Sequence, residues 1–392
     1  MAKIDDSVKK KVPELRFKGF TDEWEERKFK DILKTHSFRS YLAGVSENGE
    51  YEVIQQGDKP IVGYSDGEPF TDYKDVTLFG DHTVSLYKPK SPFFVATDGV
   101  KILSADNFEG NYLYTTLERY KPEPQGYKRH FTILKNQDVW FTENMEEQQK
   151  IGSLFKQLDD TIALHQRKLD LLKEQKKGYL QKMFPKNGAK VPELRFAGFA
   201  DDWEERKLGD VGDTFTGLTG KTKEDFGHGS AKFVTYVNVF QNPIATLDQL
   251  DAVEIDEKQN QVQKGDVFFT TSSETPEEVG MSSVWTYDTK NVYLNSFTFG
   301  YRPRVSFDLN YMASMLRSPS IRKKITFLAQ GISRYNISKT KMLEIEIPAP
   351  NLSEQTKIGL FFKGLDDTIA LHQRKLDLLK EQKKGFLQKM FV

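Results

Sequence analysis

Three absences in the sequence restrict the kind of protein it can encode. There is no cysteine, which excludes disulfide bonds and thiolate metal sites and fits a reducing compartment. The 57 basic and 57 acidic residues leave no net charge, so any surface that binds a polyanion must be local. No apolar stretch is long enough to span a bilayer, and the N-terminal residues MAKIDDSVKKKVPELRF lack a signal-peptide run. We therefore expect a cytoplasmic protein that does not enter a membrane.

Motifs for catalysis, cofactors and metals are also missing or incomplete. Thr216-GLTGKT resembles the end of a phosphate-binding loop, but Phe215 stands where that loop needs its first glycine. No Asn/Asp-Pro-Pro-Tyr/Phe tetrapeptide is present, so an adenine amino-methyltransferase site has no obvious residues. The histidines form no metal-binding pair and are scattered along the chain at His36, His82, His130, His165, His228 and His372. We expect no catalytic residue, no cofactor and no metal site.

The sequence does contain two long internal repeats. Leu158–Gly178 returns without a change as Leu365–Gly385, and Lys11–Phe29 returns in closely similar form as Lys190–Leu208. The order is therefore motif, variable block, long helix, and then the same again. Each copy of the shorter motif carries a tryptophan, which is Trp24 in Lys11–Phe29 and Trp203 in Lys190–Leu208. We expect these residues to pack the variable block onto a helix, although a binding epitope is the alternative.

The exact repeat has the periodicity of a coiled coil, with apolar residues at alternating spacings of four and three. At about 1.5 Å per residue each helix should extend roughly 55 to 60 Å. A narrow apolar stripe needs a partner, and the other copy can supply it in parallel or antiparallel orientation. The helix-pair seam is predicted at Ile151, Phe155, Leu158, Ile162, His165, Leu169, Leu172, Ile358, Phe362, Leu365, Ile369, His372, Leu376 and Leu379. Polar seam residues such as His165 are expected to fix the register of the two helices, and the alternative is a catalytic or metal-binding histidine.

The two variable blocks differ in sequence and both alternate short strands with turns. Strands are expected, among others, at 131–134 in the first block and 233–240 in the second, and helices at 309–318 and 320–329. Asn144 and Asn351 are the expected N-caps of the long helices. The predicted boundaries are 1–144 for the first domain, 145–187 for the first helix and linker, 188–351 for the second domain and 352–392 for the second helix.

Basic and aromatic clusters lie at a similar distance before each long helix. They are Tyr127-Lys-Arg-His-Phe131 and Gly331-ISRYNISKT-Lys341. Arginine can bond guanine, asparagine can bond adenine, and lysine can hold phosphates. Solvated surface loops are the simpler interpretation. The residues predicted to contact DNA are Lys128, Arg129, Lys221, Lys223, Arg334, Tyr335 and Lys339.

This arrangement resembles the specificity subunit of type I restriction-modification systems. The resemblance covers essentially the whole chain: V-P-E-L-R-F-x-G-F with W-E in duplicate, E-Q-x-K-I-G after Ile345-Glu-Ile-Pro348, and L-D-x-x-I on a long helix. It implies an α+β fold with a pseudo-twofold internal repeat. In that fold two globular α/β target-recognition domains are separated by two long conserved helices packed as an antiparallel coiled coil, whose length sets the gap between half-sites.

The resemblance also implies function and partners. Each half would read one part of a bipartite site in double-stranded DNA. Two modification (methyltransferase) subunits and the ATP-dependent restriction subunits would supply the chemistry, so the chain itself would not be an enzyme. Two other hypotheses remain: a coiled-coil protein-interaction scaffold without sequence-specific DNA binding, and a stand-alone nuclease or methyltransferase, against which the missing motifs count.

Overall fold

The computed structural model describes residues 11–126, 128–186 and 188–392. The first ten residues, Tyr127 and Asn187 lie outside the described residues, and with them the start of the N-terminal segment and one member of the first basic cluster. The chain forms two compact units. One comprises the residues up to Arg167 together with Gln373–Val392, and the other is Lys168–His372. Each unit therefore includes part of both long helices.

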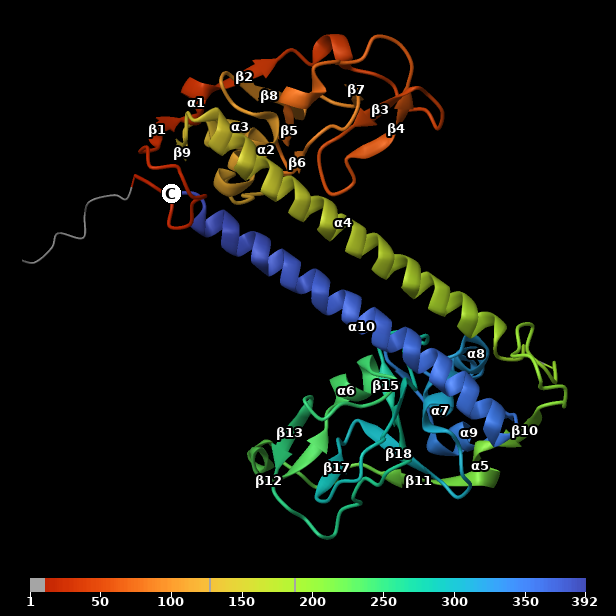
Figure 1. Ribbon diagram of the computed structural model, residues 1–392. Coiled ribbons are helices and arrows are strands. Elements are labelled where there is room, and N and C mark those ends of the chain that lie inside the picture. The colour runs from red at the N-terminus through yellow and green to blue at the C-terminus, as the bar shows by residue number, and fades with distance from the viewer. Residues whose placement is uncertain (1–10, 127, 187) are drawn as a thin grey trace, which may run out of the picture. The chain divides into compact units, whose positions relative to one another are not determined.

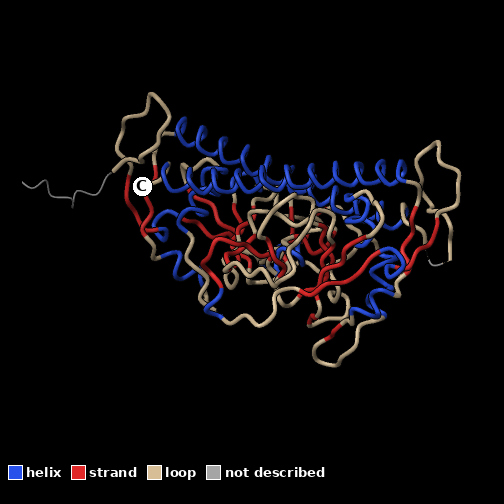
Figure 2. Tube along the Cα trace, turned by 90° about the horizontal axis from the view of Figure 1, so that it is seen from below, coloured by secondary structure: helices blue, strands red, loops and turns tan. Residues whose placement is uncertain are grey.

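The long helices are α4 (Met145–Lys182) and α10 (Leu352–Lys389), and each is α-helical without a break (Figures 1 and 2). Their starts are capped as expected, because Asn144 Oδ1 accepts from Glu147 N at 3.2 Å and Asn351 Oδ1 accepts from Glu354 N at 2.9 Å. Acidic residues in the first turn and a lysine at the end suit the helix dipole.

Helix segments run antiparallel inside each unit. In the first unit Phe155 lies 6.3 Å from Phe391, between ring centroids, and Asp159 lies 2.6 Å from Lys383 Nζ. In the second unit Lys176 Nζ lies 2.5 Å from Asp366, and Tyr179 lies 4.9 Å from Phe361. In both units the residue number rises on α4 while it falls on α10, which is the antiparallel direction that we expected.

The predicted seam residues are not equally buried. The buried ones are Ile151, Phe155, Leu169, Leu172, Ile358, Phe362 and Leu376. The half-buried ones are Leu158, Ile162, His165, Leu365, Ile369, His372 and Leu379. Their role as a continuous coiled-coil seam stays a prediction.

The first domain contains β1 (Glu25–Lys28), α1 (Phe29–Ile32), β2 (Leu33–His36), β3 (Tyr51–Ile54), β4 (Ile61–Ser65), β5 (Thr77–Gly80), β6 (Leu86–Tyr87), β7 (Phe93–Val95), β8 (Val100–Ala105), α2 (Gly110–Tyr120), α3 (His130–Lys135) and β9 (Asp138–Phe141). The four-stranded sheet has the order β2-β8-β5-β6, the three-stranded sheet β4-β3-β7, and β1 pairs with β9.

The second domain contains β10 (Glu204–Lys207), α5 (Leu208–Val211), β11 (Gly212–Thr216), β12 (Phe226–Val234), α6 (Tyr236–Gln241), β13 (Leu250–Val253), β14 (Val267–Thr270), β15 (Ser272–Ser273), β16 (Ser282–Val284), β17 (Val292–Leu294), β18 (Thr298–Pro303), α7 (Leu309–Leu316), α8 (Pro319–Phe327), β19 (Tyr335–Asn336), α9 (Lys339–Leu343) and β20 (Glu346–Ala349). Its sheets have the orders β11-β18-β14-β16 and β13-β12-β17, with the pairs β10-β20 and β15-β19.

The two domains therefore share one topology despite their divergent sequences. In each domain a four-stranded antiparallel sheet adjoins a three-stranded sheet with one parallel pair, β3-β7 or β12-β17. The small sheet β15-β19 has no counterpart among the described strands of the first domain. The duplication thus extends through the variable blocks as a fold.

Two strand predictions were wrong. Residues 131–134 lie in α3, because the Phe131 N–H donates to Asp81 Oδ1 at 2.9 Å and the segment turns into a helix there. Residues 233–240 begin in β12 but continue as α6, whose N-cap Thr235 accepts from Asn238 N at 3.2 Å. Both segments are rich in aromatic and β-branched residues, and capping hydrogen bonds override that propensity.

The repeated motif Lys11–Phe29 joins the start of one long helix to the end of the other. Arg16 makes two bonds to the buried Glu147 of α4, at 2.6 and 2.9 Å, while Leu15 N donates to Lys389 O of α10 at 2.8 Å. The second half repeats this arrangement with other partners: Arg195–Glu354 at 2.7 and 2.8 Å, and Leu194 N–Lys182 O at 2.9 Å.

Trp24 and Trp203 are buried beside these contacts. Trp24 packs edge-on against Phe391, and Trp203 packs edge-on against Tyr311 of α7. The tryptophans thus belong to the domain cores, as the packing interpretation predicted, and are not an exposed epitope.

The buried ion pair gives the first testable prediction. Removing Glu147 leaves the Arg16 guanidinium without its bidentate partner, so Glu147→Ala should lower the free energy of unfolding by about 3 kcal/mol. The neighbouring Glu146 is exposed and its carboxylate lies 2.8 Å from the exposed Lys150 Nζ, so Glu146→Ala should cost less than about 0.5 kcal/mol. Denaturant unfolding followed by circular dichroism measures both changes. Equal effects of the two substitutions would refute the structural role of Arg16–Glu147.

Candidate nucleic-acid interface

In the first domain Asp81 joins three segments at the end of β5. Its N–H donates to Gly99 O at 2.8 Å, its carbonyl accepts from His130 N at 2.8 Å, and its carboxylate accepts from Phe131 N. The buried His130 ring also contacts Asp81 O through Nδ1 at 3.0 Å and accepts from Gln125 N at Nε2 at 2.8 Å. The loop before α3 is therefore held on both sides.

That loop presents the first pair of predicted DNA contacts. Lys128 is exposed and donates to Gln125 Oε1 at 3.0 Å, and Arg129 is exposed at the N-cap position of α3. Arg129 lines an open groove of about 520 Å³ with the cations Arg39 and Lys101 and the single carboxylate Asp81. Three permanent positive charges against one negative charge suit a polyanion.

In the second domain Thr271, at the end of β14, takes the place of Asp81 and joins the segments around Phe297 and Ile337. Thr271 donates from N and Oγ1 to Phe297 O, at 3.1 and 2.8 Å, and its carbonyl accepts from Ile337 N at 3.0 Å. The β15-β19 pair continues this contact through Ser272 and Asn336. The Thr271–Phe297 bond corresponds to the Asp81–Gly99 bond of the first domain.

The hairpin before α9 presents three further predicted contacts. Gln330 and Asn336 exchange backbone hydrogen bonds of 2.9 and 2.8 Å, and Gly331 makes the turn between them with φ of +144°. Arg334 is exposed on this turn, and Tyr335 is half-buried on β19. Lys339 is half-buried at the start of α9.

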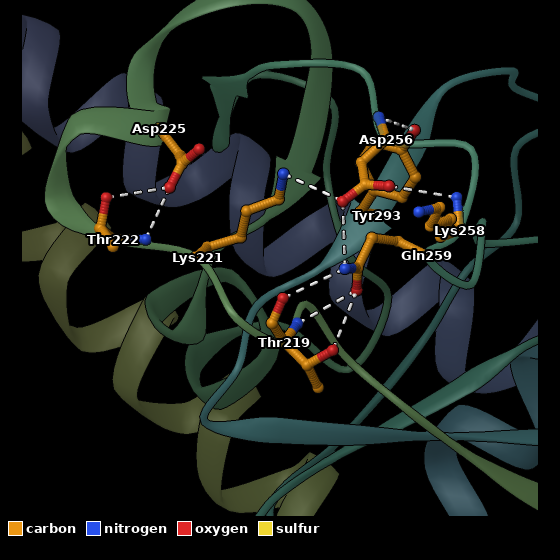
Figure 3. A network of polar contacts seen from close by, with 8 residues as sticks. All are labelled: Thr219, Lys221, Thr222, Asp225, Asp256, Lys258, Gln259 and Tyr293. Atoms are coloured by element: carbon orange, nitrogen blue, oxygen red, sulfur yellow. Dashed lines mark hydrogen bonds and ion pairs between the residues drawn. The ribbon is translucent and has the colours of Figure 1, made fainter.

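Lys221 is held in a polar network around Asp256 (Figure 3). Its Nζ lies 3.1 Å from the Asp256 carboxylate and its side chain is only 13% exposed. The hydrogen bond with Asp256 raises the pKa of Lys221, and the same bond lowers the pKa of Asp256. Gln259 and Tyr293 also bond Asp256. Lys221 therefore positions its loop, whereas the exposed Lys223 lies outside the network.

The loop that contains Lys221 starts beside the turn at residues 295–297, which includes Phe297. Leu218 N donates to Leu294 O at 2.7 Å, and a Cβ on Gly217 would lie 2.0 Å from Asn295 O. The structure thus places the start of the Lys221 loop beside the 295–297 turn, and Thr271 joins that turn to the segment that follows the Arg334 hairpin. Contact of all seven predicted residues with DNA stays a prediction.

Sequence reasoning missed several residues of these surfaces. Arg39 and Lys101 in the first domain and Phe297 in the second carry no motif, because each reaches its surface only through loops at the ends of different strands. Ile332 lies inside the second basic cluster but was not singled out. Within residues 11–126, 128–186 and 188–392, no group of three or more histidine or acidic residues is arranged to hold a metal ion. None of the helices so described is long and apolar enough to cross a membrane.

A family model and two known relatives of this chain all concern specificity subunits of type I restriction enzymes. Residues 21–174 and 200–381 match the family model of the type I restriction modification DNA specificity domain. The chain is 24% identical over 201 residues to a putative type I restriction enzyme MjaX specificity subunit of Methanocaldococcus jannaschii, covering 49% of this chain and 46% of that protein. It is 23% identical over 251 residues to the MjaVIII specificity subunit of the same organism, covering 62% and 59%. The matches span about half the length of these relatives.

Solved structures show the same fold. A type I restriction-modification S subunit from M. genitalium aligns with a TM-score of 0.67 and 15% identity, over 97% of this chain and 99% of that chain. A chain from a structure described as the basis of complex assembly and conformational transition of the type I R-M system aligns with a TM-score of 0.52 and 14% identity, over 94% and 97%.

The two lysines of the Lys221 loop should behave differently. Lys223→Ala should weaken binding to duplex DNA equally for all sequences and reduce the slope of log affinity against log salt by about 1, as expected for one lost phosphate contact. Lys221→Ala should instead lower the melting temperature, because Asp256 loses its ion pair with Lys221. Fluorescence anisotropy across a salt series and thermal unfolding separate the two effects. An unchanged salt slope in Lys223→Ala would remove Lys223 from the interface.

Proposed function

This chain belongs to the type I restriction modification DNA specificity family, and from that premise we propose that it selects the DNA sequence on which a type I restriction-modification complex acts. Each domain reads one half of a bipartite target. The chain performs no catalysis itself. It acts in the cytoplasm, where the DNA is accessible.

One observation carries this proposal: two domains of the same topology present different side chains from equivalent loops. In the first domain Asp81 joins the loop after β5 to the loop before α3. In the second domain Thr271 joins the loop after β14 to the loop before α9. The first domain places Arg129 there, and the second places Arg334 and a hairpin of its own. A shared fold with unlike loops is suited to reading two unlike half-sites.

The partners follow from the repeated helices. On α4 Leu164 and Leu171 are exposed seven residues apart, and on α10 Leu371 and Leu378 are exposed at the same spacing. Because the surrounding sequence is identical in both helices, these two apolar stripes favour two copies of one partner. We assign them to two modification subunits, which methylate adenine, and the restriction subunits join this complex.

The function is tested by sequencing the methylome of a host that lacks such systems. The host receives this chain together with its cognate modification subunit. We expect N6-methyladenine on both strands of a split motif, and none when this chain is omitted. An assembled complex that adds no methylation would favour a coiled-coil scaffold that binds only proteins.

Single substitutions should divide the target between the domains. Arg334→Ala should relax specificity in one half-site, by about 1 to 3 kcal/mol if Arg334 contacts a base, and leave the other half unchanged. Arg129→Ala should affect the other half only. Methylome sequencing of both variants shows which positions become degenerate. A uniform loss across all sequences would make either arginine a phosphate contact, and loss in the same half-site for both would refute the division.

A further inference from the structure

Two large apolar side chains are exposed at the candidate interface of the second domain. Phe297 is 60% exposed on the turn between β17 and β18, and Ile332 is 95% exposed in the hairpin before α9. Single exposed apolar residues are common on protein surfaces and usually need no explanation. These two differ because each lies on a segment that the backbone holds in place.

Hydrogen bonds fix the Phe297 turn from both sides. The Phe297 N–H donates to Asn295 Oδ1 at 2.9 Å, and its carbonyl accepts from Thr271 N and Oγ1. Asn295 in turn donates from Nδ2 to Val234 O at 2.9 Å. The aromatic ring is therefore presented to solvent by a turn that cannot easily withdraw it.

Ile332 occupies the turn of a hairpin that is closed by reciprocal bonds between Gln330 and Asn336. The Arg334 carbonyl lies 2.0 Å from where a Cβ on Gly331 would be, so the turn is tight and depends on glycine. Ile332 and Arg334 are exposed on the same short turn. An apolar group and a guanidinium are thus displayed together.

The first domain has no large apolar residue at the equivalent turn, 96–99. The Asp81–Gly99 bond takes the place of the Thr271–Phe297 bond, so Gly99 corresponds to Phe297, and Asp98 precedes it. The β15-β19 hairpin that leads to Ile332 is also absent from the described strands of that domain. The exposed apolar groups are therefore specific to the second domain rather than a requirement of the fold.

We propose that Phe297 and Ile332 recognise the 5-methyl groups of thymine in the major groove of the half-site read by the second domain. The methyl group is the apolar feature of a base edge, and apolar side chains distinguish thymine by contact with it. Arg334, exposed on the same turn as Ile332, supplies the positive charge that draws this surface to DNA rather than to an apolar protein surface. This inference rests on the proposed function.

The test removes single methyl groups from the DNA. The full chain, assembled with its modification subunits, is titrated with duplexes in which each thymine of the second half-site is replaced in turn by deoxyuridine. At the recognised positions the replacement should weaken binding roughly three- to tenfold, the range expected for one buried methyl group. Phe297→Ala or Ile332→Ala should weaken binding to the thymine duplex by a similar factor. At the position that the missing side chain contacts, deoxyuridine should then have no further effect.

Val305→Ala is the matched control. Val305 is also exposed and apolar, but it follows the opposite end of β18 from Phe297. This variant should keep the full sensitivity to deoxyuridine. Thermal unfolding of all three variants checks that the exposed substitutions leave the fold intact.

Several results would overturn the inference. They are a second half-site without thymine on either strand, wild-type binding that ignores every deoxyuridine, and variants that remain as sensitive as the wild type. Equal weakening on target and scrambled duplexes by Phe297→Ala would assign the ring to a non-specific wedge and also overturn it. Failure of the proposed function is distinguishable, because the wild-type complex would then not prefer the target over a scrambled duplex.

Discussion

The buried ion pair between the repeated motif and the start of each long helix is the contact on which each half depends. Arg16 and Arg195 reach Glu147 and Glu354 with two bonds each, and both carboxylates are buried. Burying an ion pair costs desolvation, which only bidentate geometry and further hydrogen bonds offset. Because the preceding leucine of each motif also caps the end of the other helix, one short segment holds two helices in antiparallel order.

The residues that follow the buried glutamate attach the domain to its helix. Gln148 accepts from Glu109 N at 2.8 Å and donates to Thr142 O at 2.8 Å, so it links α4 to the start of α2 and the end of β9. Gly152 lets α2 approach, since a Cβ there would lie 2.4 Å from Glu109 Oε2. Gln355 and Gly359 repeat these contacts with Asp308. The repeated signature is therefore structural, which explains why it is the same in both halves while the blocks differ.

This division explains what the sequence could predict. Periodicity located α4 and α10, and the duplicated motif predicted a duplicated fold, because packing alone dictates those residues. Strands were misassigned at 131–134 and 233–240, where hydrogen bonds from distant or capping residues, Asp81 and Thr235, decide the local structure. At the interface, composition identified the segments around Arg129 and Arg334. Lys101 and Phe297 were missed, because only the folding of separate loops brings them there. The ion pair of Lys221 with Asp256 was not foreseen either, and contact of Lys221 with DNA stays a prediction.

The same backbone hydrogen bond supports different loop surfaces in the two domains. Asp81 N–Gly99 O and Thr271 N–Phe297 O occupy equivalent places, and neither bond uses the side chain of the acceptor residue. The bond therefore forms with a glycine as acceptor in one domain and with an exposed phenylalanine in the other. The β15-β19 hairpin extends the second surface without altering the order of the four-stranded sheet. Since each domain is tied to the helices by its own arginine, glutamine and glycine contacts, its loops can change without disturbing those contacts in the other domain.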